Sequence, residues 1–475
     1  MLFNSVAFAL FYILVTTLYF VCPYRFRWVI LLAASCYFYM AFVPIYILIL
    51  GFTIVIDYIA GIYIEKEQDP RKRKLLLVVS LISNIGILAF FKYFNFINLN
   101  IDYIFHEFNW HNPIPYLTIL LPIGLSFHTF QAMSYTIEVY RGNHKAEKHF
   151  GIYSLYVMFY PQLVAGPIER PQNILYQMHT KYPFNYQLMT SGLKMMLWGF
   201  FKKLVIADRL SIFVNSVYNN PDLHNGTTIV IASLFFAVQI YCDFSGYTDI
   251  AIGCAKTMGF DLMKNFNRPY FATNIQDFWR RWHISLSTWF RDYLYIPLGG
   301  SKVSTGRRYL NLFIIFAVSG IWHGANYTYI IWGALHGLYS VVYVIIKPYL
   351  RKESENEFIN TITRMGNTVI TIGFVTFAWI FFRANSVGDA FTVIRNLKSF
   401  GARPFMGDGV SNFAHSLLAI AILFAVEYKM EFIPQRFNWF TSRNIVVRWG
   451  SIALTVFLLL ILGVFNGGQF IYFQF

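Results

Sequence analysis

The residues of this sequence that could do chemistry begin with a histidine in an uncharged stretch. Residues 309–346 contain no Asp, Glu, Lys or Arg, yet they include His323 within the segment Ser319–Asn326 and, further on, His336. A buried histidine is the side chain most easily used as a neutral base near pH 7. A lone histidine on an apolar helix is more often a packing residue, so composition by itself leaves both roles open for His323.

The charges that flank this stretch predict its shape. Basic residues bracket it at 307–308 and again at 347–352. If both ends lie in the cytoplasm, the stretch folds as a hairpin inside the bilayer, with its turn at Gly324–Asn326. The first arm, Tyr309–His323, would rise about 22 Å at about 1.5 Å per residue. His323 would then lie deep in the membrane but short of its far side.

A second polar segment, Tyr241–Asp249, continues a long apolar run and contains Asp243, Ser245 and Asp249. Carboxylates at membrane depth are costly, and they usually line a cavity or pair with a base. The alternative is that they cap or pin neighbouring helices, and the sequence favours neither reading. Asp243 and Ser245 are therefore predicted as substrate-binding candidates.

A third segment is too charged for a spanning helix. Between Asp261 and Arg308 there are eight Lys or Arg residues and three acids, interleaved with aromatic residues. This mixture is typical of an interfacial or re-entrant segment that faces the cytoplasm, where arginine can hold phosphates and Trp anchors at the headgroups. By charge alone, the candidates for a donor's phosphates are Arg280, Arg281 and Arg291. Binding of lipid headgroups is the alternative.

Other kinds of site have little support in the sequence. A metal site built from His283, His323 and His336 would lack an HExxH motif, clustered carboxylates and Cys ligands, so no metal is predicted. No GxSxG elbow or GxxxxGK[ST] loop is present, which argues against a hydrolase or an ATPase. The four cysteines form no CxxC pair and lie in apolar segments, where inert thiols are expected; they are Cys22, Cys36, Cys242 and Cys254.

The elements that must position these residues are membrane helices. Of the 475 residues, 57% are hydrophobic, 20% aromatic and only 13% charged, whereas a soluble domain is about 45–50% apolar and about 25% charged. This composition excludes a disordered chain and an ordinary soluble enzyme, and it predicts an all-α polytopic membrane protein. The net charge of +15 would suggest nucleic acid as a partner of a soluble protein. Here the basic residues stand between apolar stretches, so no nucleic-acid partner is expected.

A membrane crossing takes about 20 apolar residues. Candidate apolar stretches are Ser5–Val21, Trp28–Phe42, Ile45–Ile64, Leu75–Phe91, Leu117–Tyr140, Tyr153–Val164, Met189–Ile206, Ile229–Cys254, Tyr309–Ile346, Thr368–Phe382, Phe413–Val426 and Ile445–Val464. They predict about eleven crossings plus one or two re-entrant pieces in a single domain, residues 1–475. The basic loops at 25–27, 65–74 and 141–148 share the cytoplasmic side only if the N-terminus is extracytoplasmic.

Several long motifs occur in the order of a known family. They are Leu121–Gln131, Tyr135–Gly142, Tyr160–Arg170, Asp243–Gly253, Asn265–Tyr270, Trp279–Gly300, Trp322–Asn326 and Phe470–Phe475. Together they resemble the membrane-bound O-acyltransferase family, more narrowly its bacterial branch that contains the alginate O-acetylation membrane subunit. The resemblance covers most of the chain from residue 120 onward. This sequence departs from the branch at His128, where an aromatic residue is more usual, and at Tyr327, where Trp is.

The resemblance implies a fold and a set of site residues. It implies tilted helices around a central tunnel that joins a cytoplasmic funnel to the outer face. The family's catalytic histidine falls on His323. The second polar position of this branch falls on His283, which either takes part in the chemistry or only lines the donor tunnel. Trp322 and Asn326 would position the reacting carbonyl.

The resemblance also implies a reaction in a bacterial inner membrane. An acetyl group from a cytoplasmic thioester, expected to be acetyl-CoA, would cross the membrane for O-acetylation of an extracytoplasmic polysaccharide, without a bound cofactor. His323 would act as a general base or carry the acyl group transiently. An extracytoplasmic serine-type transferase with an SGNH fold would be the partner protein, and membrane lipid would surround the chain. The alternatives are D-alanyl transfer to teichoic acid from a carrier-protein thioester, and a transporter without chemistry.

Overall fold

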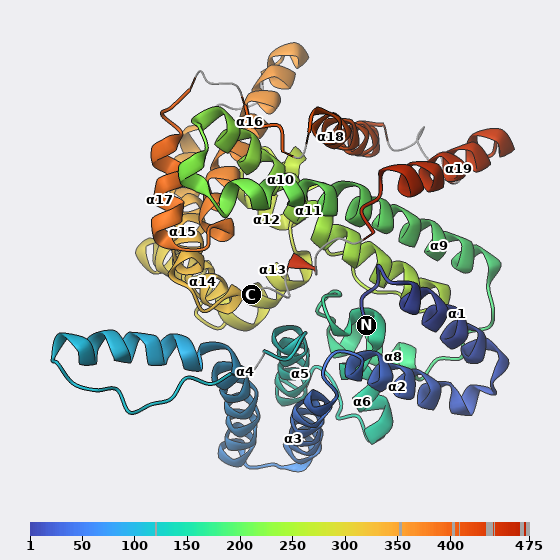
Figure 1. Cartoon of the computed structure of the whole chain (residues 1–475). Helices are drawn as coiled ribbons and strands as arrows, with labels where there is room; N and C mark the ends of the chain where they lie inside the picture. Colours follow the sequence, from blue (N-terminus) through green and yellow to red (C-terminus); the bar gives the residue numbers. More distant parts are fainter. Residues whose placement is uncertain are drawn as a thin grey trace. The chain divides into compact units, whose positions relative to one another are not determined.

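The computed structural model describes residues 1–118, 121–350, 354–400, 404–407, 409–433, 440, 442–465 and 470–471. Every regular element in those residues is a helix, and the helices fall into two compact units (Figure 1). Unit 1 comprises Met1–Met196 and Thr248–Met263, and unit 2 comprises Leu197–Tyr247 and Lys264–Phe475. The all-α fold expected from the sequence is confirmed. The assignment of one domain to the whole chain stays a prediction.

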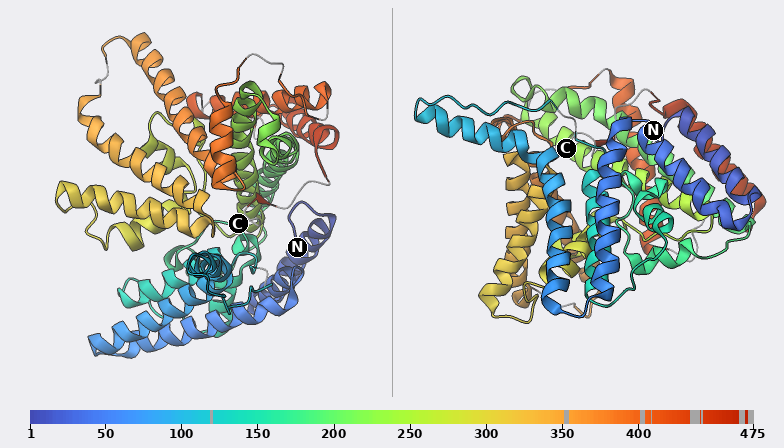
Figure 2. Two further views of the ribbon diagram at one scale, coloured as in Figure 1. Left: turned by 60° about the vertical axis from the view of Figure 1, so that its left-hand side comes forward. Right: turned by 90° about the horizontal axis from the view of Figure 1, so that it is seen from below.

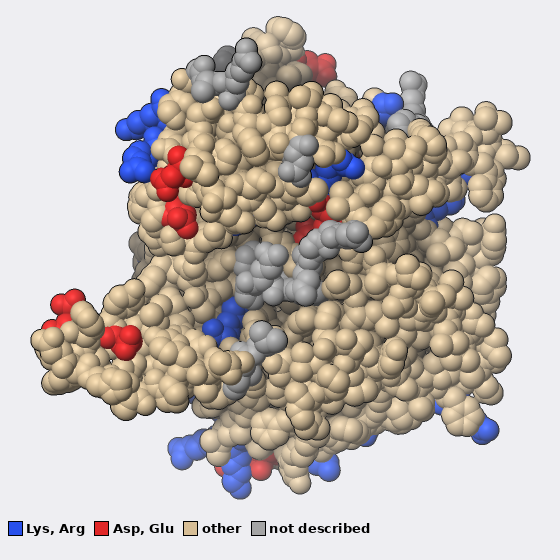
Figure 3. Space-filling view, in the orientation of Figure 1, with Lys and Arg blue, Asp and Glu red and all other residues tan. Residues whose placement is uncertain are grey.

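The helices of unit 1 alternate with short loops. They are α1 (Val6–Val21), α2 (Tyr24–Met40), α3 (Ile47–Lys66), α4 (Pro70–Glu107), α5 (Leu125–Tyr140), α6 (Phe150–Met158), α7 (Tyr160–Leu163), α8 (Pro171–Met178) and α9 (Tyr186–Phe200), whose last residues pass into unit 2. Helix α4 is longer than the predicted crossing, and Figure 2 shows that it changes direction part-way along. Its outer end carries the exposed acids Asp102 and Glu107, on a face that is otherwise mostly uncharged (Figure 3).

Helices α3, α4 and α5 pack around one buried carboxylate. Asp57 of α3 accepts hydrogen bonds from Ser80 Oγ (2.6 Å) and Asn84 Nδ2 (2.9 Å) of α4, and Ser80 also contacts Thr136 of α5 (3.1 Å). Between apolar helices in a membrane, such side-chain hydrogen bonds supply directional attraction that apolar burial does not. They explain why three helices with apolar, lipid-facing outer surfaces hold one arrangement.

The start of α5 differs from the sequence-based expectation. The predicted crossing Leu117–Tyr140 is helical only from Leu125, and residues 119–120 lie outside the described part. Pro122 and Gly124 precede the helix, and Gly124 has φ +76°, a left-handed conformation that glycine adopts at no steric cost. A Cβ atom there would also lie 2.7 Å from the carbonyl oxygen of Leu163. The helix therefore begins later than hydropathy alone predicts.

The basic loops of unit 1 meet on one face. Arg73, at the start of α4, donates to the carbonyl oxygens of Ile64 (3.2 Å) and Tyr140 (2.9 Å), at the ends of α3 and α5. Lys148 pairs with Glu65 across the same loops. We call this the basic face of unit 1. The expectation that loops 65–74 and 141–148 lie on one side is thus confirmed, whereas its orientation toward the cytoplasm stays a prediction.

Unit 2 contains the longest helices of the C-terminal half. Its elements are a π-helical turn η2 (Phe201–Ala207), α10 (Asp208–Tyr218), most of α11 (Gly226–Thr257), α12 (Ile275–Arg281), α13 (Ile284–Phe290), the π-helical turn η5 (Arg291–Tyr295), α14 (Thr305–His323), α15 (Tyr327–Ile346), α16 (Glu357–Arg383), α17 (Val387–Asn396), α18 (Val410–Phe432) and α19 (Ile445–Leu462). Single 3-10 turns join some of them: η3 (Pro221–Leu223), η4 (Pro269–Phe271) and η6 (Lys347–Tyr349), with η1 (Pro44–Tyr46) in unit 1.

Seven helices in the described part of the chain are long and apolar enough to cross a membrane. They are Pro44–Lys66, Pro70–Glu107, Gly226–Thr257, Tyr327–Tyr349, Glu357–Arg383, Val410–Phe432 and Ile445–Leu462, and Val6–Val21 is a shorter apolar helix. The chain is therefore a multi-pass membrane protein. Other predicted crossings fall on helices of 17 and 16 residues, α2 and α5, or on broken ones such as α6–α7, so the number eleven stays a prediction.

The predicted hairpin is present as α14 and α15. The chain breaks between them at residues 324–326, as the Gly-Ala-Asn sequence predicted. Glycines let the backbones of α14 and α15 approach closely. A Cβ atom on Gly333 would lie 2.4 Å from the carbonyl oxygen of Phe316, and a Cβ atom on Gly320 would lie 2.4 Å from the carbonyl oxygen of Tyr329. Gly333 and Gly337 form a GxxxG pattern, which is typical of close contacts between membrane helices. The close packing of α14 against α15 thus depends on small residues at the seam, the line of contact between the two helices.

Replacing Gly333 by valine is expected to destabilise the protein by about 1–3 kcal/mol, because the added side chain must displace the backbone of α14. Thermal unfolding of the purified protein in detergent measures this loss. Gly373→Val is the matched control, since a Cβ at Gly373 of α16 meets nothing within 4 Å. Equal melting temperatures of the two variants would show that the seam does not require glycine.

Candidate functional site

His323 is the last residue of α14 and lies in a pocket of aromatic rings. Its ring is edge-on to Trp322 (4.9 Å between centroids), Trp332 (4.9 Å) and Phe382 (5.3 Å), and only 5% of the residue is exposed. The helix ends there because Gly324 turns to an extended conformation, where a Cβ would lie 2.2 Å from the ring of Tyr329. The sequence therefore places an imidazole at the helix end, within unit 2, in apolar surroundings.

Asn326 has a structural role next to His323. Its side-chain oxygen accepts from the backbone N–H of Thr328 (3.0 Å), which caps the N-terminus of α15, and its Nδ2 donates to the carbonyl oxygen of Asn385 (3.2 Å). Capping satisfies a backbone donor that the helix leaves unpaired. Asn326 thus fixes the turn of the hairpin, and its predicted role in substrate binding stays a prediction.

His283 lies at the break between α12 and α13 with a left-handed backbone, φ +43°. Non-glycine residues adopt this region rarely, and such strain is often found at functional sites. Two backbone hydrogen bonds hold the break in place: Ile284 N–H donates to the Asn265 carbonyl (2.8 Å) and Asn267 N–H to the Arg281 carbonyl (2.9 Å). The loop 265–267 therefore clamps the backbone on either side of His283.

The side chain of Asn265 fixes the tautomer of His283. Asn265 Oδ1 accepts from Ser285 N–H (3.1 Å) and from Ser285 Oγ (2.9 Å), so this atom is an oxygen, and it lies 3.1 Å from His283 Nδ1. Nδ1 must then carry the proton and donate it, which puts the lone pair on Nε2. Burial lowers the pKa of His283 to about 3. The ring is therefore a neutral imidazole whose Nε2 can accept a hydrogen bond.

Trp322 connects the two histidines. Its ring lies 6.5 Å from the ring of His283 and 4.9 Å from that of His323, centroid to centroid. On its other side, His283 is edge-on to Phe244 of α11 (4.6 Å). The two sequence-predicted histidines are thus brought together within unit 2, around an indole that was itself predicted as a site residue.

Asp243 and Ser245 belong to a buried ionic cluster. Lys203 Nζ contacts Asp208 Oδ1 (2.7 Å) and Asp243 Oδ1 (2.6 Å), and Lys202 Nζ donates to Ser245 Oγ (2.9 Å). The π-helical turn η2 buries both consecutive lysines, which are 3% and 5% exposed. Asp243 is therefore paired with a base, and the substrate-binding roles predicted for Asp243 and Ser245 stay predictions.

The same carboxylate holds the C-terminal segment. The backbone N–H of Ile471 donates to Asp243 Oδ2 (2.7 Å), and the ring of Phe470 stacks on Tyr247 (4.8 Å) and contacts Phe244 (5.6 Å). Phe244 also contacts His283, so a chain of direct contacts joins the ionic cluster to the candidate site. The rest of the predicted motif, residues 472–475, lies outside the described residues.

Replacing Lys203 by methionine is expected to destabilise the protein by about 3–5 kcal/mol, because the change leaves two buried carboxylates without their cation. Thermal unfolding in detergent is the measurement, and Lys302→Met, at an exposed lysine of unit 2, is the control. Adding Asp208→Asn and Asp243→Asn should restore much of the loss, since no unpaired charge then remains. A single Lys203→Met variant that melts like the parent would contradict the cluster's structural role.

The three arginines proposed for a donor's phosphates have different surroundings. Arg281 pairs with Asp277 (3.1 Å) and with Glu431 (2.7 Å), so its guanidinium is already held by two carboxylates. Arg280 is exposed, and Arg291 is largely exposed and contacts Asp292 (2.7 Å). Arg280 and Arg291 are therefore the more accessible of the three, and phosphate binding by any of them stays a prediction.

His336 contacts the ring of Trp332, which also contacts His323. It is fully buried between Trp279 (4.9 Å) and Trp332 (5.0 Å), and both ring nitrogens lack a hydrogen-bond partner among the described residues. Within that part of the chain, no group of three or more His, Cys, Asp or Glu side chains is arranged to hold a metal ion. His336 is best described as a packing residue of the hairpin.

Comparison with known proteins shows to which family this chain belongs. The sequence model of the membrane-bound O-acyltransferase family matches residues 144–386, just over half of the chain. A Pseudomonas aeruginosa protein named probable alginate O-acetylase is 38% identical over 392 residues, which cover 81% of this chain and 72% of that protein. This chain belongs to the membrane-bound O-acyltransferase family. It is therefore a membrane acyltransferase, as the motifs predicted.

Two other relatives of this membrane-bound O-acyltransferase differ in their named acceptors. A peptidoglycan O-acetyltransferase of Helicobacter pylori is 35% identical over 396 residues, covering 78% of this chain and 73% of that protein. A teichoic acid D-alanyltransferase of Bacillus subtilis is 29% identical over 284 residues, covering 57% and 69%. The matches to the Pseudomonas and Helicobacter proteins thus cover more of this chain than the match to the D-alanyltransferase does.

Sequence reasoning about this membrane-bound O-acyltransferase missed three residues of the site. Asn265 lies in the family motif Asn265–Tyr270, which assigns it no role. Lys202 and Lys203 fall inside the predicted apolar crossing Met189–Ile206. A signal was present for the lysines: two consecutive cations inside Met189–Ile206 are costly at membrane depth unless they are paired. For Asn265 no local signal existed, because its partner is 18 residues away along the chain.

Proposed function

We propose that this protein is an O-acetyltransferase of the inner membrane of a bacterium. It takes an acetyl group from a cytoplasmic thioester, acetyl-CoA, and passes it across the membrane for O-acetylation of an extracytoplasmic polysaccharide. The named activities of the Pseudomonas and Helicobacter relatives support acetyl as the transferred group. The single structural observation that carries the proposal is the pair of buried histidines, His283 and His323, both in ring contact with Trp322.

The proposed chemistry uses His323 as the general base. An acceptor hydroxyl loses its proton to the imidazole of His323 while its oxygen attacks the thioester carbonyl. The carbon–sulfur bond then breaks, and the departing thiolate takes the proton back from the imidazolium. General-base help of this kind contributes about 10²–10⁴ in rate. The dry aromatic surroundings protect the thioester from hydrolysis.

His283 has a second, supporting role in this proposal. Its Nε2 carries the lone pair, because Asn265 accepts the proton of Nδ1. A neutral imidazole there can accept a hydrogen bond from the acceptor hydroxyl or from the donor's amide groups and so orient one of them toward His323. Trp322, in contact with both rings, would form the wall against which the acetyl group lies.

Delivery to the polysaccharide needs a further protein in this proposal. We infer an extracytoplasmic serine-type transferase as the partner, as the resemblance of the motifs to the bacterial O-acetylating branch of the family implies. We also infer that the basic face of unit 1 is cytoplasmic and the N-terminus extracytoplasmic, in accord with the positive-inside rule.

The decisive experiment uses the purified full-length protein in liposomes with radiolabelled acetyl-CoA on one side. Transfer of label to a polysaccharide or to the co-reconstituted partner, absent with His323→Ala, is expected. A parallel reaction with a D-alanyl carrier-protein thioester tests the alternative donor. Label transfer only from the carrier protein would overturn the acetyl assignment, and passage of donor without acyl transfer would indicate a transporter.

A further inference from the structure

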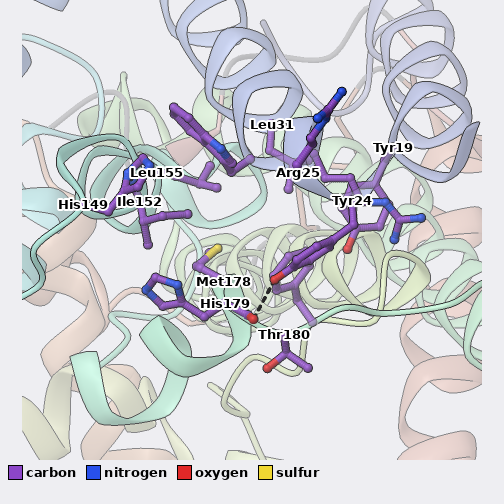
Figure 4. A pocket seen from close by; sticks show the side chains of 13 residues that line it. Tyr19, Tyr24, Arg25, Leu31, His149, Ile152, Leu155, Met178, His179 and Thr180 are labelled. Carbon is purple, nitrogen blue, oxygen red and sulfur yellow. Dashed lines mark hydrogen bonds between the residues drawn. The ribbon is translucent and has the colours of Figure 1, made fainter. Parts of the chain in front are cut away.

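A pocket of about 140 Å³ lies in unit 1, at the turn between α1 and α2 (Figure 4). It is lined by Tyr19, Tyr24, Arg25, Arg27, Trp28, Leu31, His149, Ile152, Leu155, Met178, His179, Thr180 and Phe260. None of these lining residues is acidic, whereas two are arginines and two are histidines. The two arginines therefore supply positive charge at a pocket with aromatic walls.

The walls of the pocket are held by specific contacts. The hydroxyl of Tyr24 donates to the carbonyl oxygen of His179 (2.6 Å), which joins the α1–α2 turn to the end of α8 (Figure 4). Arg27 donates to the carbonyl oxygen of Tyr182 (2.6 Å) and lies over the ring of Tyr19 (4.8 Å). These contacts fix Arg27 in the wall. Arg25 is exposed and lies over the ring of Phe26 (4.7 Å), a contact that it would exchange for a ligand's phosphate.

The pocket lies on the basic face of unit 1. Its residue His179 contacts Glu147 (2.7 Å), whose loop also carries Lys148, the partner of Glu65. The loops of α1–α2, α3–α4 and α5–α6 therefore meet at the same end of the unit. In a membrane protein such a basic end faces the headgroups of the cytoplasmic leaflet, which are anionic.

The surface of α1 leads from lipid to this pocket. Leu10, Leu14 and Val21 are 66%, 59% and 76% exposed, so an apolar stripe runs along α1 to its C-terminal end. Immediately beyond it come Tyr24 and Arg25, and Trp28 follows on α2. Tyr and Trp are typical of the membrane–water interface, where their rings lie at headgroup level. Acyl chains on the stripe would thus bring a headgroup to the mouth of the pocket.

We propose that this pocket binds the phosphate of an anionic phospholipid, with Arg25 and Arg27 as its cationic partners and the acyl chains along α1. Guanidinium groups bind phosphate oxygens through paired, charge-assisted hydrogen bonds. The site is independent of the acyl-transfer reaction. Phosphates of a soluble ligand such as coenzyme A share this chemistry, and the test below separates the two sources.

The test measures lipid that stays bound to the purified full-length protein. The protein is equilibrated in mild detergent with equal amounts of phosphatidylglycerol and phosphatidylcholine, and bound lipid is counted by native mass spectrometry. We expect phosphatidylglycerol to be retained by the parent and at least tenfold less by Arg25→Gln. Arg71→Gln, at an exposed arginine on the same face, is the matched control and should retain it like the parent.

Two outcomes would overturn the proposal. Equal retention of phosphatidylglycerol by the parent and Arg25→Gln would show that this pocket does not hold the lipid. Binding of coenzyme A that depends on Arg25, with no preference for phosphatidylglycerol, would assign the pocket to a soluble phosphate ligand instead. Arg25→Lys, which keeps the charge, should retain most of the lipid, and monodisperse elution of each variant controls for folding.

Discussion

Acetyl transfer is expected to disappear when His323 is replaced by alanine. In the proposed mechanism this imidazole takes the proton of the acceptor hydroxyl, and its ring lies edge-on against Trp322, Trp332 and Phe382. Loss of a general base costs about 10²–10⁴ in rate. The measurement is transfer of labelled acetyl groups by the reconstituted protein and its partner.

Controls for this variant follow from the surroundings of His323. His323→Gln fills most of the space that alanine leaves, so it separates loss of chemistry from a cavity in the aromatic cluster. His336→Leu is a matched control, since that histidine is also buried on the same hairpin and packs between the rings of Trp279 and Trp332. Normal acetylation by His323→Ala would rule out the mechanism.

The same assay distinguishes the two roles that were left open for His323. Acid quenching during turnover traps a labelled acyl-protein if the imidazole carries the acetyl group, whereas a general base leaves no label on the chain. The proposal predicts no label on His323. A labelled peptide containing residue 323 would assign the acyl-carrier role instead.

Replacement of His283 by alanine is expected to lower acetyl transfer by at least about 10²-fold, the lower range for a positioned acid–base group. The reason is the geometry of one hydrogen bond: Asn265 Oδ1 accepts from Nδ1 (3.1 Å), so that Nε2 has the lone pair. Asn265→Ala removes the acceptor and frees the tautomer, and it should cause a smaller loss in the same direction.

A comparison of substitutions at Asn265 tests whether the tautomer matters. Asn265→Asp keeps an acceptor oxygen for His283 and for Ser285, so it should retain more activity than Asn265→Ala at equal expression. Ratios of kcat and KM for the acetyl donor separate the effects, because a purely structural change would lower the amount of folded protein without altering KM. Full activity of His283→Ala would limit its role to packing.

Much of the hairpin could be predicted from the sequence because its signals are local. The absence of charge over 38 residues indicates burial in the membrane, and Gly324 with Asn326 indicates the break. The structure confirms the break, with α14 ending at His323 and α15 beginning at Tyr327. Helix α15 is also long and apolar enough to cross a membrane, whereas burial of α14 in the bilayer stays a prediction. Helix ends were less predictable where glycine and proline intervene, as at Gly124 before α5, because hydropathy does not report backbone conformation.

The contacts of the polar side chains could not be predicted in the same way. Asp243 was a substrate candidate by sequence, but its oxygens are taken by Lys203 and by the backbone of Ile471, 228 residues further along the chain. Arg281 was a phosphate candidate by charge, but Asp277 and Glu431 hold it. Charge alone shows that a residue needs a partner, whereas only the packed helices show which partner it has.

The amino-acid sequence by itself determined that this chain is a helical membrane protein, where its apolar helices lie, and which histidine ends an uncharged hairpin arm. It did so because hydropathy, helix breaks and family motifs are properties of neighbouring residues. Only the tertiary structure decided that Asn265 sets the tautomer of His283, that Trp322 contacts both imidazoles, and that Asp243, paired with the buried Lys203, holds Ile471 of the C-terminal segment. Those facts depend on distances between segments far apart in the chain, which the packing of helices alone sets.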